Sequence, residues 1–120
     1  MTEIQNSKQY DLEERTLNLA RRVIEFVNRL PKTLPNIEIS RQLVKSSGSV
    51  GANYIEANEA LSKKDFVVRI KICRKESKES RYWLKLVQVR ERKDEKERVA
   101  LVQEATELMK IFGSILEKSK

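Results

Sequence analysis

Residues 62–87, SKKDFVVRIKICRKESKESRYWLKLV, are the most strongly patterned stretch of the sequence. Ser62 followed three residues later by Asp65 is a capping box, which predicts that a helix begins here. When successive residues are placed about 100° apart around a helix, one face gathers Phe66, Ile70, Cys73, Ser77 and Leu84. We expect this face to line a core, on a helix that extends to about Val89.

A second apolar stripe lies on another side of the same helix, about 200–260° from Phe66. It consists of Val68, Ile72, Trp83 and Leu86. A helix in a lone four-helix bundle needs only one apolar face, so the second stripe indicates an interface with another subunit. Trp83 is a typical anchor of such an interface. The alternative is one wide core face that reaches neighbouring helices within a single chain.

A basic surface lies between these two apolar faces. Its residues are Lys64, Lys71, Arg74, Lys75, Lys78, Arg81, Lys85 and Arg92. Residues 63–98 contain 14 Lys and Arg against 7 Asp and Glu, so this segment carries the whole net charge of +7. Such a surface can neutralise a run of phosphates, which predicts salt-dependent and largely sequence-independent binding of RNA or DNA. The alternative is an ordinary solvated face.

Two further capping boxes predict where the first and last helices begin. They are Asp11 with Glu14, and Asp94 with Glu97. The predicted apolar residues of the first helix are Leu12, Leu19, Val23, Val27 and Leu30, with Ile24 and Phe26 on the flanks; those of the last helix are Val99, Val102, Ala105, Met109, Phe112 and Leu116.

The remaining helix is predicted from Asn36, as its cap, to about Leu61, because the prolines of PKTLPN end the first helix. Its apolar face is formed by Val50, Tyr54, Ala57 and Leu61, and two further apolar residues, Val44 and Ile55, lie outside this face. The helix is also rich in small residues, namely Ser46, Ser47, Gly48, Gly51, Ala52, Ala57 and Ala60. Glycine costs a helix about 1 kcal/mol relative to alanine, so we expect a compensating close approach of another helix. The alternative is that Gly48 breaks the helix.

No stretch alternates with period two for long enough to form a strand. The prediction is therefore an all-α, antiparallel up-down-up-down four-helix bundle that forms one domain over residues 1–120, with a flexible N-terminus at about 1–10. A looser three-helix arrangement with a frayed first segment is the alternative. No stretch approaches the roughly 20 apolar residues of a membrane span. The single cysteine and the absence of a signal-like N-terminus predict a cytoplasmic protein.

The sequence lacks the residues that most catalytic and metal sites use. It has no histidine and one cysteine, and it contains no phosphate-binding loop, so we expect no enzyme activity, no metal and no cofactor. Carboxylates at i, i+3 spacing, Glu56, Glu59, Glu76 and Glu79, lack the Glu-x-x-His motif of di-metal bundles. A carboxylate-based hydrolase that depends on a metal ion is a third function class, which the sequence leaves open. We expect Glu56, Glu76 and Glu79 to pair instead with Arg69, Lys75 or Arg81, within or between chains.

Residues 46–57, SSGSVGANYIEA, together with residues 62–87, resemble the four-helix-bundle family of the 23S rRNA intervening-sequence proteins, also called S23-type. The matching positions are Ala52, Asn53, Glu56, Ala57, Asp65, Phe66, Glu76, Ser77, Glu79, Trp83 and Leu84. The resemblance implies a bacterial, ring-shaped homopentamer, and it implies structural roles for Asn53, Glu56, Glu76 and Glu79. Gly51 departs from the family pattern, in which proline is frequent, and so does Ala57, where glycine is common.

These observations predict a non-enzymatic, oligomeric bundle protein that binds nucleic acid through the basic surface. A structurally similar relative, the accessory variability protein of diversity-generating retroelements, is a basic barrel that works with a reverse transcriptase. The alternative is accordingly a protein-interaction scaffold, for example for a reverse transcriptase, without direct binding of nucleic acid.

Overall fold

The computed structural model describes the backbone of residues 3–120 and the side chains of residues 11–120. It contains four helices: α1 (Glu3–Asn28), α2 (Leu34–Asn58), α3 (Lys63–Leu86) and α4 (Arg92–Lys118). Over these described residues there is no strand, so the predicted all-α, four-helix fold class is confirmed. α2 runs without interruption through Gly48, so the alternative in which Gly48 breaks this helix is wrong.

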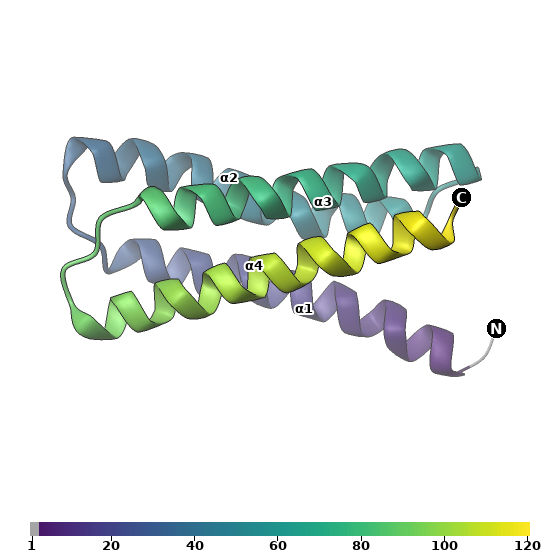
Figure 1. Ribbon diagram of the computed structural model, residues 1–120, viewed down its shortest axis with the longest axis horizontal. Coiled ribbons are helices and arrows are strands. Elements are labelled where there is room, and N and C mark those ends of the chain that lie inside the picture. Colours follow the sequence, from purple (N-terminus) through teal and green to yellow (C-terminus); the bar gives the residue numbers. More distant parts are fainter. Residues whose placement is uncertain (1–2) are drawn as a thin grey trace.

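Each helix packs against the next one in the chain, and α4 packs against α1. The result is a four-sided bundle of 47 × 24 × 20 Å. Figure 1 shows α3 and α4 in front of α1 and α2, with the connections at alternate ends of the bundle and the first turns of α1 diverging from α4. The loose three-helix alternative is therefore wrong.

α1 begins at Glu3, so Asp11 lies inside this helix and does not cap it. The first capping-box prediction is wrong for this reason. Of the N-terminal segment that we expected to be flexible, residues 1–2 lie outside the described residues and residues 3–10 belong to the backbone of α1.

The cap of α2 is Thr33, whose side chain accepts a hydrogen bond from the backbone N–H of Asn36. Asn36 is not the cap. Its buried side-chain amide donates to the carbonyl oxygens of Pro31 (3.1 Å) and Gln88 (2.9 Å) and accepts from the N–H of Gln88 (2.9 Å). Asn36 thereby joins the α1–α2 connection to the α3–α4 connection.

The predicted boundaries of α3 are partly right. Ser62 caps this helix and accepts from the N–H of Asp65 at 3.1 Å, as the capping box predicted. α3 ends at Leu86, however, and not near Val89. α2 ends at Asn58, which leaves Leu61 exposed in the connection rather than on the apolar face of a helix.

α4 begins after Glu91, and the third capping box is wrong because its two carboxylates pair with α1 instead. Arg15 and Arg22 of α1 and Arg29, the residue that directly follows α1, are spaced seven residues apart and each bind carboxylates of α4; we call these contacts the ion-pair ladder. They are Arg15 with Glu104 and Glu107 (both 2.7 Å), Arg22 with Glu97 (3.1 Å), and Arg29 with the buried Asp94 (2.7 Å). The ladder holds the seam between the first and last helices.

The core contains the predicted apolar face of α3, with Ile70, Cys73 and Leu84 fully buried. The prediction for α4 needs a correction, because Val99 is 60% exposed while Leu101 and Leu108 are buried. Phe26 of α1, which we placed on a flank, is also fully buried.

Candidate functional site

The structure places all but one of the predicted basic residues on α3. We define the basic stripe as Lys64, Lys71, Arg74, Lys75, Lys78, Arg81 and Lys85. All of these are exposed except Arg81, which is half-buried and donates to the hydroxyl of Thr106 on α4 (3.4 Å). Arg92 does not belong to this stripe: α3 ends at Leu86, and Arg92 is the first residue of α4.

The cations of the basic stripe lack carboxylate partners. Among the side chains of residues 11–120, none of the seven forms an ion pair, whereas the arginines of the ion-pair ladder are all paired. α3 carries nine Lys and Arg against three Asp and Glu. The chain itself therefore does not neutralise the positive charge of this helix at short range. An anion-binding surface needs positive charge that is left free in this way.

The second apolar stripe of α3, which we call the apolar stripe, is half covered. Val68 and Leu86 are 47% and 48% exposed, whereas Ile72 and Trp83 are half-buried. Trp83 packs against the core. The alternative prediction, in which α3 has one wide core face, is therefore correct in part for this residue. The indole N–H of Trp83 is buried and has no hydrogen-bond partner among the described residues.

Tyr82 is a surface residue that our sequence reasoning missed. It is 58% exposed, and its ring lies edge-to-face with Trp83, with ring centres 5.0 Å apart and an angle of 76° between the rings. The helical spacing would have revealed it, because Tyr82 lies about 160° from Phe66, at the border between the basic and apolar stripes.

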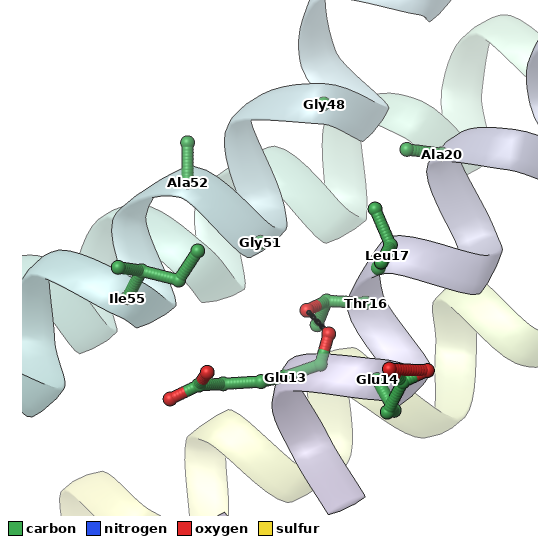
Figure 2. A pocket seen from close by; sticks show the side chains of 9 residues that line it. All are labelled: Glu13, Glu14, Thr16, Leu17, Ala20, Gly48, Gly51, Ala52 and Ile55. Atoms are coloured by element: carbon green, nitrogen blue, oxygen red, sulfur yellow. Dashed lines mark hydrogen bonds between the residues drawn. The ribbon is translucent and has the colours of Figure 1, made fainter. Parts of the chain in front are cut away.

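A shallow groove of about 320 Å³ lies between α1 and α2. In Figure 2, Leu17 and Ala20 of α1 face Gly48, Ala52 and Ile55 of α2 across it. Glu13 and Glu14 also line this α1–α2 groove, and the side chains of Leu17 and Ile55 are exposed. It is a second apolar surface, separate from the apolar stripe of α3.

The small residues of α2 serve different purposes. At Gly51 an added Cβ would lie 2.9 Å from the hydroxyl oxygen of Thr16, so this glycine permits the predicted close approach of α1. At Gly48 an added Cβ would meet nothing within 4 Å, so there the close-packing prediction is wrong. Towards α3, the buried hydroxyls of Ser46 and Ser80 share a hydrogen bond of 2.8 Å.

The acidic residues of α2 and α3 do not form the expected ion pairs within the chain. Within the described side chains, Glu56, Glu76 and Glu79 have no Arg or Lys partner. Arg69 instead donates to the side-chain oxygen of Asn53 (2.9 Å), which links α3 to α2. Burial, reinforced by the neighbouring Glu79, raises the pKa of Glu76 above its ordinary value.

The described residues contain no group of three or more His, Cys, Asp or Glu that could hold a metal ion. Burial raises the pKa of the Cys73 thiol to about 12, so this thiol stays protonated and unreactive near neutral pH. Over the same part of the chain, no helix combines the length and apolar character that crossing a membrane requires.

A family model described as 23S rRNA-intervening sequence protein matches residues 8–114. The chain belongs to this family. The predicted resemblance is thus confirmed, and a solved member supports it: a protein of unknown function from the S23 ribosomal protein family of Bacteroides thetaiotaomicron VPI-5482. The two chains are 28% identical and align with a TM-score of 0.79, over 92% of this chain and 98% of the other. A search of curated proteins finds no match.

Two residues that carried the resemblance to the 23S rRNA-intervening sequence proteins have visible structural partners. Asn53 donates to the carbonyl oxygen of Ser49 (2.9 Å) while it accepts from Arg69, so it fixes the α2–α3 seam. Ser77 donates to the carbonyl of Cys73 and lies in the core. Asn53 thus lies between α2 and α3, and Ser77 lies in the core.

Proposed function

We propose that this member of the 23S rRNA-intervening sequence protein family is a non-enzymatic, ring-forming oligomer that binds nucleic acid through the basic stripe of α3. The observation that carries the proposal is the set of seven α3 cations that have no carboxylate partner among the described side chains. Cations left free on one helix face are suited to a line of phosphates, and their binding releases the counterions that are condensed on the nucleic acid.

The assembly part of the proposal rests on two different apolar surfaces. The apolar stripe of α3 and the α1–α2 groove lie on opposite sides of α2, so a contact between them joins unlike faces of two copies. Contacts of this kind close into a ring when the rotation between copies permits, and a homopentamer is the state that the family resemblance implies.

A ring would also strengthen the binding. Each copy adds one basic stripe, so the fields of several stripes combine into a larger positive potential than one bundle produces. If about four phosphates of a single-stranded RNA are neutralised per copy, the affinity of one contact falls roughly 50-fold between 50 and 200 mM salt.

The test is a charge reversal of the exposed centre of the stripe, Lys71→Glu, Arg74→Glu, Lys78→Glu and Lys85→Glu together. The matched control reverses four exposed lysines elsewhere, Lys45, Lys96, Lys110 and Lys118, and so gives the same net charge. We expect the stripe variant to lose binding in a gel shift with a 30-nucleotide RNA while its oligomeric mass is unchanged. Equal loss in both variants, or none in the stripe variant, would contradict the proposal.

A second candidate function is a protein-interaction scaffold that does not bind nucleic acid itself. The exposed apolar residues Val68 and Leu86 favour a protein partner as readily as a second copy. In that case a pull-down from nuclease-treated extract still recovers the partner, and purified protein does not shift RNA at low salt.

A further inference from the structure

Tyr82 is the exposed aromatic residue beside the basic stripe. Its side chain is 58% exposed, so more than half of it is accessible to a ligand. Among the described residues, its hydroxyl group has no hydrogen-bond partner, and its ring contacts one other aromatic ring, that of Trp83.

The contact with Trp83 holds the ring while leaving much of it open. The two rings meet edge-to-face, at 76° and 5.0 Å between centres. Trp83 in turn packs against the core, so it is a firm support. An edge-to-face contact covers far less of the pair than stacking would, and the exposed fraction of Tyr82 shows that its remaining surface is available to a flat ligand.

Cations flank the ring on the side of the basic stripe. Lys78 lies one turn before Tyr82 and Lys85 one turn after it, at the spacings that place side chains on the same helix face. Side chains of helices lean towards the N-terminus, so the Tyr82 ring lies over the turn that carries Lys78. On its other side the ring contacts Trp83 of the apolar stripe, and Leu86 of the same stripe lies one turn further along the helix.

We infer that Tyr82 is a base-stacking platform within the basic stripe, and that the ligand of this surface is unpaired nucleic acid, either a single strand or a loop. The inference rests on the proposed function of the stripe and specifies its ligand. In a duplex both faces of each base are covered by neighbouring base pairs, so only an unpaired base can stack on the exposed ring. Lys78 and Lys85 then bind the phosphates on either side of that nucleotide.

The experiment measures fluorescence anisotropy of the full-length protein with two RNA probes at low salt, a 15-nucleotide oligoadenylate and a 15-base-pair duplex. We expect the wild-type protein to prefer the single strand. Tyr82→Leu should weaken single-strand binding roughly tenfold and leave duplex binding unchanged, and Tyr82→Phe should retain wild-type affinity. The salt dependence of Tyr82→Leu should equal that of the wild type, because no charge is removed.

Trp83 gives a second readout, since it is the one tryptophan of the chain and contacts Tyr82. We expect its fluorescence to change when oligoadenylate binds and to change less with the duplex. Equal affinity of Tyr82→Leu and wild type for the single strand would overturn the inference, as would a loss on both probes together with a change in oligomeric mass. If the wild type binds both probes equally and only charge reversal weakens binding, stacking is refuted and the proposed function stands. If the wild type binds neither probe, the proposed function itself fails.

Discussion

Asn36 is a single buried amide that joins two connections 52 residues apart in the sequence. All three of its hydrogen bonds go to backbone groups, on Pro31 and Gln88. A backbone group that loses its partner in a buried site costs about 1–3 kcal/mol, so this one side chain has a large influence on the end of the bundle where it lies.

The corresponding prediction is that Asn36→Ala lowers the free energy of unfolding by about 3 kcal/mol, because it leaves two carbonyls and one N–H without their partner. Urea denaturation followed by circular dichroism measures this. Gln42→Ala, an exposed polar residue on the same helix, is the control and should change stability by less than about 0.5 kcal/mol. Similar stability of the two variants would show that water replaces the amide at this end.

Gly48 and Gly51 provide a matched pair on one helix. Gly48→Ala should stabilise the protein by about 0.5–1 kcal/mol, because the added methyl group meets nothing and alanine favours a helix. Gly51→Ala should destabilise it by about 1–3 kcal/mol, because Thr16 must move. Urea midpoints of the two variants decide the matter, and a stabilised Gly51→Ala would mean that α1 shifts without penalty.

At the scale of the helices, the α1–α4 seam differs from the others because charges hold it. The ion-pair ladder repeats every seven residues along α1 and ends at the residue directly after this helix, so Arg15, Arg22 and Arg29 all face α4. Its rungs are unequal: the carboxylate of Glu97 is 27% exposed, whereas that of Asp94 is 2% exposed. Solvent-exposed pairs contribute little, but removing one partner of a buried pair leaves a costly charge.

We therefore expect Arg22→Met to change the free energy of unfolding by less than about 1 kcal/mol, and Arg29→Met to cost several times as much. The second cost should largely disappear in the double variant Arg29→Met, Asp94→Leu, which removes both charges. Chemical denaturation of the wild type, Arg29→Met, Asp94→Leu and the double variant gives the coupling energy of this pair. Equal effects of the two single variants would show that Asp94 finds water or another donor.

How much of these helices the sequence predicts depends on the range of the interaction. The core face of α3 was predictable, because it follows from residues three and four apart. The capping box at Asp94 was not, because its carboxylate pairs with Arg29, 65 residues away. α4 also carries apolar side chains on several faces, and nothing local shows that Leu101 rather than Val99 points inward.

The candidate site divides in the same way. The basic stripe was predictable from helical spacing, since its residues lie on one regular helix. Arg92 was misassigned because the end of α3 at Leu86 depends on the α3–α4 connection and on Asn36, which binds Gln88. The groove between α1 and α2 could not be derived at all, because it depends on how closely Thr16 approaches Gly51.

At the scale of the whole molecule, different parts of the surface have different chemical character. α3 carries the basic stripe on one side and the apolar stripe on the other. The α1–α2 groove is a third surface, which residues of α1 and α2 line without α3. The core is complete without either apolar surface, so Val68 and Leu86 can be changed without opening it.

The prediction at this scale concerns mass in solution. We expect the wild type to assemble, with a mass close to five times its 14.1 kDa protomer, and Val68→Glu with Leu86→Glu to reduce it to the protomer with unchanged helix content. Light scattering coupled to size-exclusion chromatography measures this. Val99→Glu, at an exposed apolar residue of α4, is the control and should assemble normally. A wild-type mass of one protomer would refute the ring.

The ion-pair ladder also has a mechanical consequence. α1 begins and α4 finishes at the same end of the bundle (Figure 1), and these two helices are neighbours. Tension applied between the two ends of the chain would thus peel the helices apart like a zipper instead of shearing them. The ion pairs would break one after another, with that of Arg15 first and that of Arg29 last. The strongest pair, Arg29 with the buried Asp94, would therefore bear the force only after the other pairs have broken.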